Sequence, residues 1–164
     1  MTWLIFLAAV LVGVVVHLKL DRQPRTAHRV VTVVLLYLLV VFAGLGGLLG
    51  ALGHTFYAAQ IAHGIGWPPG SPFQFEVAMA NLAFGALGIL CIWRRDGFWT
   101  ATGVGLAVFY LGCAYGHLQD LLAHGNYAPF NAGLGIWVND AAVPLTILGL
   151  LGARARLAPK RGGV

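Results

Sequence analysis

The sequence predicts an all-α protein, a polytopic membrane bundle of five transmembrane helices with its N-terminus outside and its C-terminus in the cytoplasm. Of its 164 residues, 59% are hydrophobic and only 9% are charged, whereas a soluble domain carries about a quarter charged residues. The charges lie between apolar runs of about 20 residues, the length that spans a bilayer as a helix. The short alternating strands of a β-barrel are not visible. One bundle over residues 1–164 is therefore expected.

The spans follow one another with short connections. The first, 2–18, has its basic residues after the apolar run, so we expect a retained helix and not a cleaved signal peptide. The second is expected at 30–55, the third at 73–93, the fourth at 98–122 and the fifth at 132–153. Between the second and third, prolines exclude a helix from Trp67 to Pro72. A short interfacial helix is expected just before them, at 56–63.

Basic residues set the expected orientation. All ten fall in the first loop, the third loop or the C-terminal tail: Lys19, Arg22, Arg25, Arg29, Arg94, Arg95, Arg154, Arg156, Lys160 and Arg161. Five helices place these three segments on one side, and basic loops stay in the cytoplasm. The net charge of +5 then reflects topology and contact with the lipid bilayer, and no nucleic-acid partner is expected.

The outer half holds acids and imidazoles without a lysine or arginine to pair them. They are Glu76, Asp120, Asp140, His54, His63, His117 and His124. Ionisable groups at membrane depth are costly and generally mark a site inside the bundle. A metal ion, protonation or water would each make such a group tolerable.

The fourth span shows the clearest polar face. Tyr110, Cys113, His117, Asp120 and His124 recur at steps of three and four, which places them on one stripe of a helix. Gly112 and Gly116 are expected to let another helix approach closely beside this stripe. With His54 at the same outer level, the predicted metal ligands are His54, His117 and Asp120, a donor set that suits Zn or Fe.

The predicted ligand-binding residues are Asn81, Glu76, Asp140 and Tyr110. Asp140 lies fourteen residues before Arg154, or about 21 Å deeper in the membrane at 1.5 Å per residue. Pro144 cannot donate to the carbonyl of Asp140, so the helix is expected to kink there. Asn81 shares a stripe with Gly85 and Gly88, whereas Glu76 lies well around the same helix.

Several segments carry a family resemblance. The stretch from Trp67 to Gly85, the motif His17-Leu18-Lys19-Leu20-Asp21 and the motif Gly125-Asn126-Tyr127-Ala128-Pro129 resemble a family of small bacterial inner-membrane proteins of unknown function. The short multi-helix plan is loosely similar to DoxX-like membrane proteins. These resemblances imply a multi-pass protein of the bacterial inner membrane and supply no catalytic residue.

Three functions remain open at this point. The first is a membrane-embedded binding protein whose His/carboxylate site takes a divalent metal or a small polar ligand, for transport, sensing or metal-dependent chemistry. The second is a b-type haem electron-transfer protein with His54 and His117 as axial ligands. The third is a non-catalytic accessory subunit of a larger membrane complex, or a homo-oligomer, held by the glycines of the second span. No sequence motif assigns an enzymatic reaction.

Overall fold

Five helices in the computed structural model are long and apolar enough to cross a membrane, within the described residues 2–159. They are α1 (Thr2–Leu20), the continuous span Ala27–Phe56, α5 (Phe73–Leu90), α6 (Gly97–His124) and the span Leu134–Leu157. The described residues contain no strand, which confirms the all-α prediction. The tail residues Lys160 and Arg161 lie outside the described range.

Two of the spans are interrupted by π-helical segments. The second consists of α2 (Ala27–Leu38), η1 (Leu39–Gly46) and α3 (Gly47–Phe56). The last consists of α7 (Leu134–Trp137), η2 (Val138–Ala142) and α8 (Val143–Leu157). A π turn has one more residue per hydrogen-bonded ring than an α turn, and it often marks a functional position.

The helix boundaries differ from the predicted ones for local reasons. α2 begins at Ala27, three residues before the expected start, because the Thr26 hydroxyl accepts a hydrogen bond from the backbone N–H of Arg29 and caps the helix. α5 ends at Leu90 and not at 93, and the Cys91 carbonyl beyond it accepts a bond from the indole of Trp99. The expected interfacial helix is α4 (Ala58–Ile65), which ends at Gly66 in the left-handed region, with φ of 85°.

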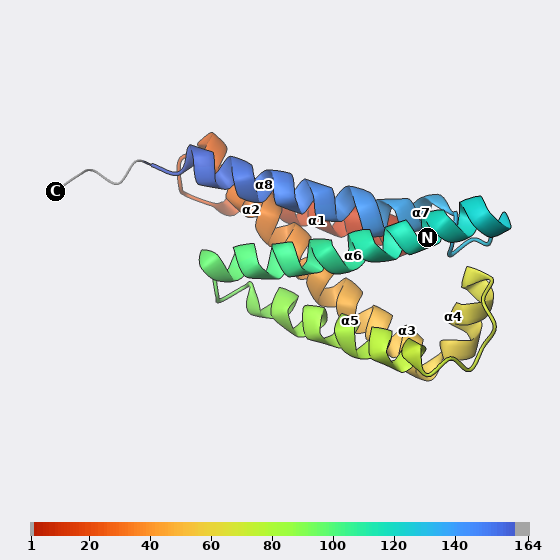
Figure 1. Cartoon of the computed structure of the whole chain (residues 1–164). Helices are drawn as coiled ribbons and strands as arrows, with labels where there is room; N and C mark the ends of the chain where they lie inside the picture. Colours follow the sequence, from red (N-terminus) through yellow and green to blue (C-terminus); the bar gives the residue numbers. More distant parts are fainter. Residues whose placement is uncertain (1, 160–164) are drawn as a thin grey trace.

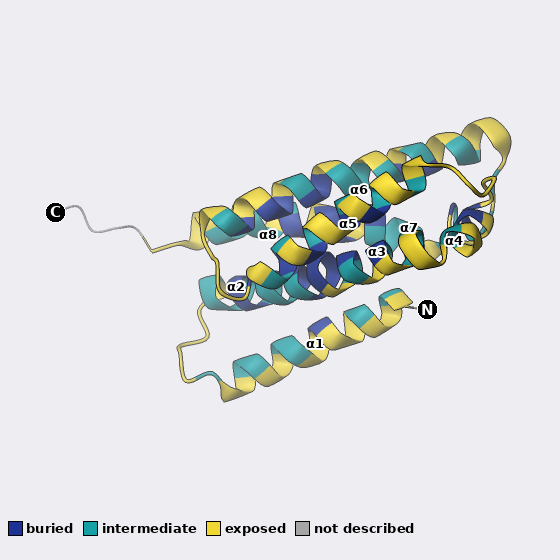
Figure 2. Cartoon of the chain, turned by 90° about the horizontal axis from the view of Figure 1, so that it is seen from below, coloured by how far each residue is buried: buried dark blue, intermediate teal, exposed yellow. Residues whose placement is uncertain are grey.

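The long helices run roughly along one axis (Figure 1), so their connections gather at two ends. The α1–α2 loop, the α5–α6 turn and the end of α8 lie at one end, which we call the basic end because every described lysine and arginine lies in these segments or in the helix turns next to them. The opposite end, called the loop end, holds α4, the end of α6 and the start of α7. Figure 2 shows α1 along the side of the bundle, with much of its surface exposed.

The core follows the helix pairs. α2 packs against α8, α6 packs against α8, and η1 and α3 pack against α5. Leu35, Leu39, Leu106 and Ile147 are almost completely buried at the centre. Trp99 is fully buried too, and the guanidinium carbons of Arg95 and Arg154 lie 5.3 and 5.1 Å from its ring centre. Trp99 is therefore a core residue of the basic end.

Glycines bring α5 onto the second span with backbone-to-backbone contact. A Cβ on Gly47 would lie 2.6 Å from the Asn81 carbonyl oxygen and 2.7 Å from the Gly85 nitrogen, and a Cβ on Gly88 would collide with Gly44. The predicted inner stripe of α5 is confirmed, since Ala78, Asn81, Gly85 and Gly88 are its buried residues. The expected close approach at Gly112 and Gly116 is wrong for this chain, because a Cβ at either position meets nothing within 4 Å.

Candidate functional site

His117 and Asp140 meet in the bundle toward the loop end. His117 comes from α6, Asp140 from η2, and both are buried, at 8% and 5% exposure. Asp140 Oδ2 lies 3.8 Å from His117 Nε2, beyond hydrogen-bonding distance. The other oxygen, Oδ1, accepts a hydrogen bond from the Asn139 amide at 2.7 Å. A buried carboxylate therefore has one bonded oxygen and one that faces an imidazole across a short gap.

The backbone around Asp140 leaves the α-helical pattern. The N–H of Val143 donates to the carbonyl of Val138, five residues back, which closes a π turn over Asp140. Pro144 follows directly and has no N–H to donate to the Asp140 carbonyl. At the position where a kink is expected from Pro144, the structure has a π-helical segment.

Asn131 holds the imidazole of His117 in place. The side chain is fully buried, and its Oδ1 lies 2.7 Å from His117 Nδ1. Its Nδ2 donates to the carbonyls of His117 at 3.3 Å and Asn126 at 2.8 Å. An amide oxygen accepts, so this contact gives Nδ1 the proton of a neutral His117 and leaves Nε2 as an acceptor aimed at the gap. Sequence reasoning missed both asparagines: Asn131 lies in a loop, where a polar residue looks like an ordinary surface position, and Asn139 lies within the last span next to the more conspicuous Asp140.

Trp67 covers one face of His117. The two rings stack at 5.8 Å between centres with 19° between their planes. The indole N–H of Trp67 donates to Asp120 Oδ2 at 2.8 Å. The loop that carries Trp67 is thus fixed to α6 and covers His117 at the loop end.

Asp120 accepts hydrogen bonds from the two loops at this end of the bundle. Oδ2 accepts bonds from Trp67 and from the Asn126 amide, and Oδ1 lies 2.8 Å from Nδ1 of the exposed His124. Asn126 also donates to the carbonyl of Ile65, which ties the α6–α7 loop to the end of α4. Asp120 therefore organises the loop end beside the pair.

A second polar contact lies between α5 and α6. The Tyr110 hydroxyl donates to Asn81 Oδ1 at 2.8 Å, and the Asn81 amide donates to the Val77 carbonyl at 2.9 Å. Glu76 is exposed on the first turn of α5, away from the buried stripe that carries Asn81.

The predicted metal set is not supported. Among the described residues there is no group of three or more His, Cys, Asp or Glu side chains placed to hold a metal ion. His117 is engaged with Asn131 and Asp120 with the loops, and among the described residues no hydrogen bond or ion pair joins His54 to either. His54 is half-buried in α3, and its buried Nδ1 has no hydrogen-bond partner in the described part of the chain.

The chain belongs to a family of unknown function, DUF6790, whose model matches residues 1–160. The resemblance to a family without an assigned function is thereby confirmed. No curated protein and no solved structure matches the chain. The similarity to DoxX-like proteins and the bacterial origin stay predictions.

Proposed function

We propose that this protein is a membrane-embedded binding protein whose buried His117–Asp140 pair takes a small polar ligand. The single observation that carries the proposal is a carboxylate oxygen that faces an imidazole nitrogen at 3.8 Å inside an apolar bundle. No lysine or arginine contacts Asp140 in the described residues. Ionisable groups inside a membrane are retained for function rather than for stability.

The geometry favours a ligand that donates hydrogen bonds. Asp140 Oδ2 and the acceptor nitrogen of His117 are too far apart to bond each other. An ammonium group about 2.8–3.0 Å from each would donate to both atoms at once, and the two hydroxyls of a diol would each donate to one of them. An ammonium group would in addition supply the positive charge that Asp140 lacks, so small amines and polyols are the classes to test first.

Orientation of the chain completes the proposal. The basic end is assigned to the cytoplasm, as in other membrane proteins with positively charged loops. The pair then lies toward the outer leaflet of a bacterial inner membrane, with the N-terminus outside and the C-terminus inside. Trp67 and the loop end would separate the pair from the outside, so ligand entry requires this loop to move.

The test is ligand-induced thermal stabilisation of the purified protein in mild detergent. A panel of small amines and polyols is titrated against the wild type, His117→Ala and Asp140→Asn. His63→Ala and Glu76→Gln serve as matched controls, because both side chains are exposed. A stabilising compound should lose at least about tenfold in affinity in the two site variants, about the worth of one charge-assisted hydrogen bond. Equal affinity in all five proteins would refute the proposed site.

The same preparation tests the other functions. Zn and Fe titrations address the divalent-metal version, which the positions of His54, His117 and Asp120 do not favour. The absorption spectrum of the reduced protein tests the b-type haem alternative through the Soret band. Co-purification in mild detergent tests the accessory-subunit alternative.

A further inference from the structure

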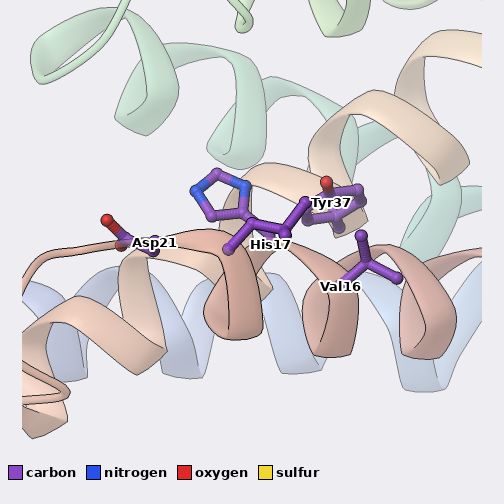
Figure 3. A pocket seen from close by; sticks show the side chains of 5 residues that line it. Val16, His17, Asp21 and Tyr37 are labelled. Carbon is purple, nitrogen blue, oxygen red and sulfur yellow. The ribbon is translucent and has the colours of Figure 1, made fainter.

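A groove between α1 and α2 opens at the basic end, far along the bundle from His117. It has a volume of about 370 Å³ and is lined by Val16, His17, Leu20, Asp21 and Tyr37. Figure 3 shows the imidazole of His17 and the hydroxyl of Tyr37 beside the same space. The Tyr37 ring reaches this position because Gly13 has no side chain, since a Cβ there would collide with the ring.

Arg29 brings a guanidinium to the edge of the groove. Its Nε donates to Asp21 Oδ2 at 2.6 Å, and its Nη2 lies 3.4 Å from His17 Nε2. A guanidinium has five N–H donors, and these two contacts use two of them. Both oxygens of Asp21 are engaged, because Oδ1 accepts from the backbone N–H of Gln23 at 3.0 Å. The carboxylate therefore orients Arg29 and leaves its outer donors for a ligand.

The surroundings of the groove are positive. The segment from the end of α1 to the start of α2 carries four cations, Lys19, Arg22, Arg25 and Arg29, against the single carboxylate of Asp21. The first three of these cations are exposed. A basic pocket between transmembrane helices attracts phosphate-bearing headgroups, which Arg binds through directional charge-assisted hydrogen bonds.

The apolar wall of the groove continues onto the outside of α1. Leu20 is 77% exposed and Val16 is 47% exposed, and Val12 and Val15 extend the same apolar helix surface toward the middle of the span. Val10 is the only residue of α1, over Thr2–Leu20, that is buried. A hydrocarbon chain attached to a group in the groove could thus lie along α1 without leaving the membrane.

We infer that this groove binds the headgroup of an anionic phospholipid, with its phosphodiester on Arg29, His17 and Tyr37 and an acyl chain along α1. Charge complementarity assigns the headgroup, and the exposed apolar surface beside it assigns the chain. This inference is independent of the ligand of His117 and Asp140. It requires only that α1 and α2 cross the membrane.

Lipid titration of the purified protein in a neutral detergent tests the inference. The melting temperature is followed as phosphatidylglycerol, phosphatidylcholine or inorganic phosphate is added. The wild type should be stabilised by phosphatidylglycerol at concentrations at which the other two have little effect. Arg29→Gln should weaken the apparent affinity at least about tenfold. Arg25→Gln, which removes the same charge from an exposed position of the neighbouring loop, should stay within about twofold.

Tyr37→Phe separates binding from folding. It keeps the ring that packs on Gly13 and removes only the hydroxyl, so it should weaken phosphatidylglycerol binding even if Arg29→Gln does not fold. Equal stabilisation by both lipids would overturn the inference, as would equal losses in Arg25→Gln and Arg29→Gln. Stabilisation by inorganic phosphate at the same concentration would assign the groove to a free anion and also overturn it.

Discussion

Replacing Gly47 by alanine should separate two helices that now touch through their backbones. The new Cβ would lie 2.6 Å from the Asn81 carbonyl oxygen, 2.7 Å from the Gly85 nitrogen and 2.9 Å from the Gly85 Cα. All three atoms belong to the backbone of α5, so no side chain can rotate away. An ordinary contact of about 3.5 Å therefore requires α3 and α5 to move apart by up to about 1 Å.

The cost of that movement follows from packing. Overfilling a close-packed interface costs about 1–3 kcal/mol, which in a chain of this size lowers the melting temperature by roughly 2–4 °C per kcal/mol. Gly47→Ala should therefore melt roughly 2–12 °C below the wild type. The assay is thermal unfolding in one detergent, followed by circular dichroism.

Gly112→Ala is the matched control. Its Cβ meets nothing within 4 Å, and alanine is the better helix former by about 1 kcal/mol in water. This variant should melt at or above the wild-type temperature. If Gly47→Ala is as stable as the wild type, or if Gly112→Ala falls by the same amount, the close backbone contact between α3 and α5 is not what limits the packing.

Three further outcomes are expected. Asn131→Ala should lower stability by about 1–3 kcal/mol in chemical unfolding, because it leaves a buried His117 nitrogen without its partner; an unchanged midpoint would contradict this. Trp99→Ala should cost about 3–5 kcal/mol, the range for emptying the site of a fully buried aromatic ring, whereas exposed Trp93→Ala should cost under about 1 kcal/mol. Bonds from the Gln23 N–H and the Arg29 guanidinium hold the pKa of Asp21 below its ordinary value of 3.8. The wild type should therefore be more stable than Asp21→Asn above pH 3.8, and this difference in stability should shrink as the pH falls through the lower pKa of the folded state. A difference in stability that stays constant down to acid pH would rule this out.

The helical spans were predictable because their signal is continuous along the chain. Apolar runs of membrane length locate α1, α5 and α6 to within a few residues. The N-cap at Thr26 is also a local signal, and placing the start of α2 at Val30 overlooked it. The π segments were harder, because an extra residue in a turn is set by what each half of a helix packs against. Of the two π segments, only Val138–Ala142 has a local sequence signal, which is Pro144.

The candidate site was predictable where it lies on regular helices and not where loops complete it. His117 and Asp140 stand out as ionisable residues within apolar spans, and the structure brings them together. Asp120 shares the helical stripe of His117, yet the partners that engage it, Trp67 and Asn126, come from loops. Loop geometry depends on tertiary contacts that helical periodicity does not encode, and this explains why His54, His117 and Asp120 are not assembled as predicted.

The π-helical segment Leu39–Gly46 gives the second span two different neighbours. The first part of the span, α2, packs against α8, and the last part, α3, packs against α5. Figure 1 shows this orange ribbon passing from one side of the bundle to the other. Removing one residue from this segment would turn everything beyond it by about 100° and point the glycines of α3 away from α5. The π-helical segment therefore sets how the residues that face α5 are rotated relative to those that face α8. A mutation that changed the number of residues in this segment would break one of these two helix contacts.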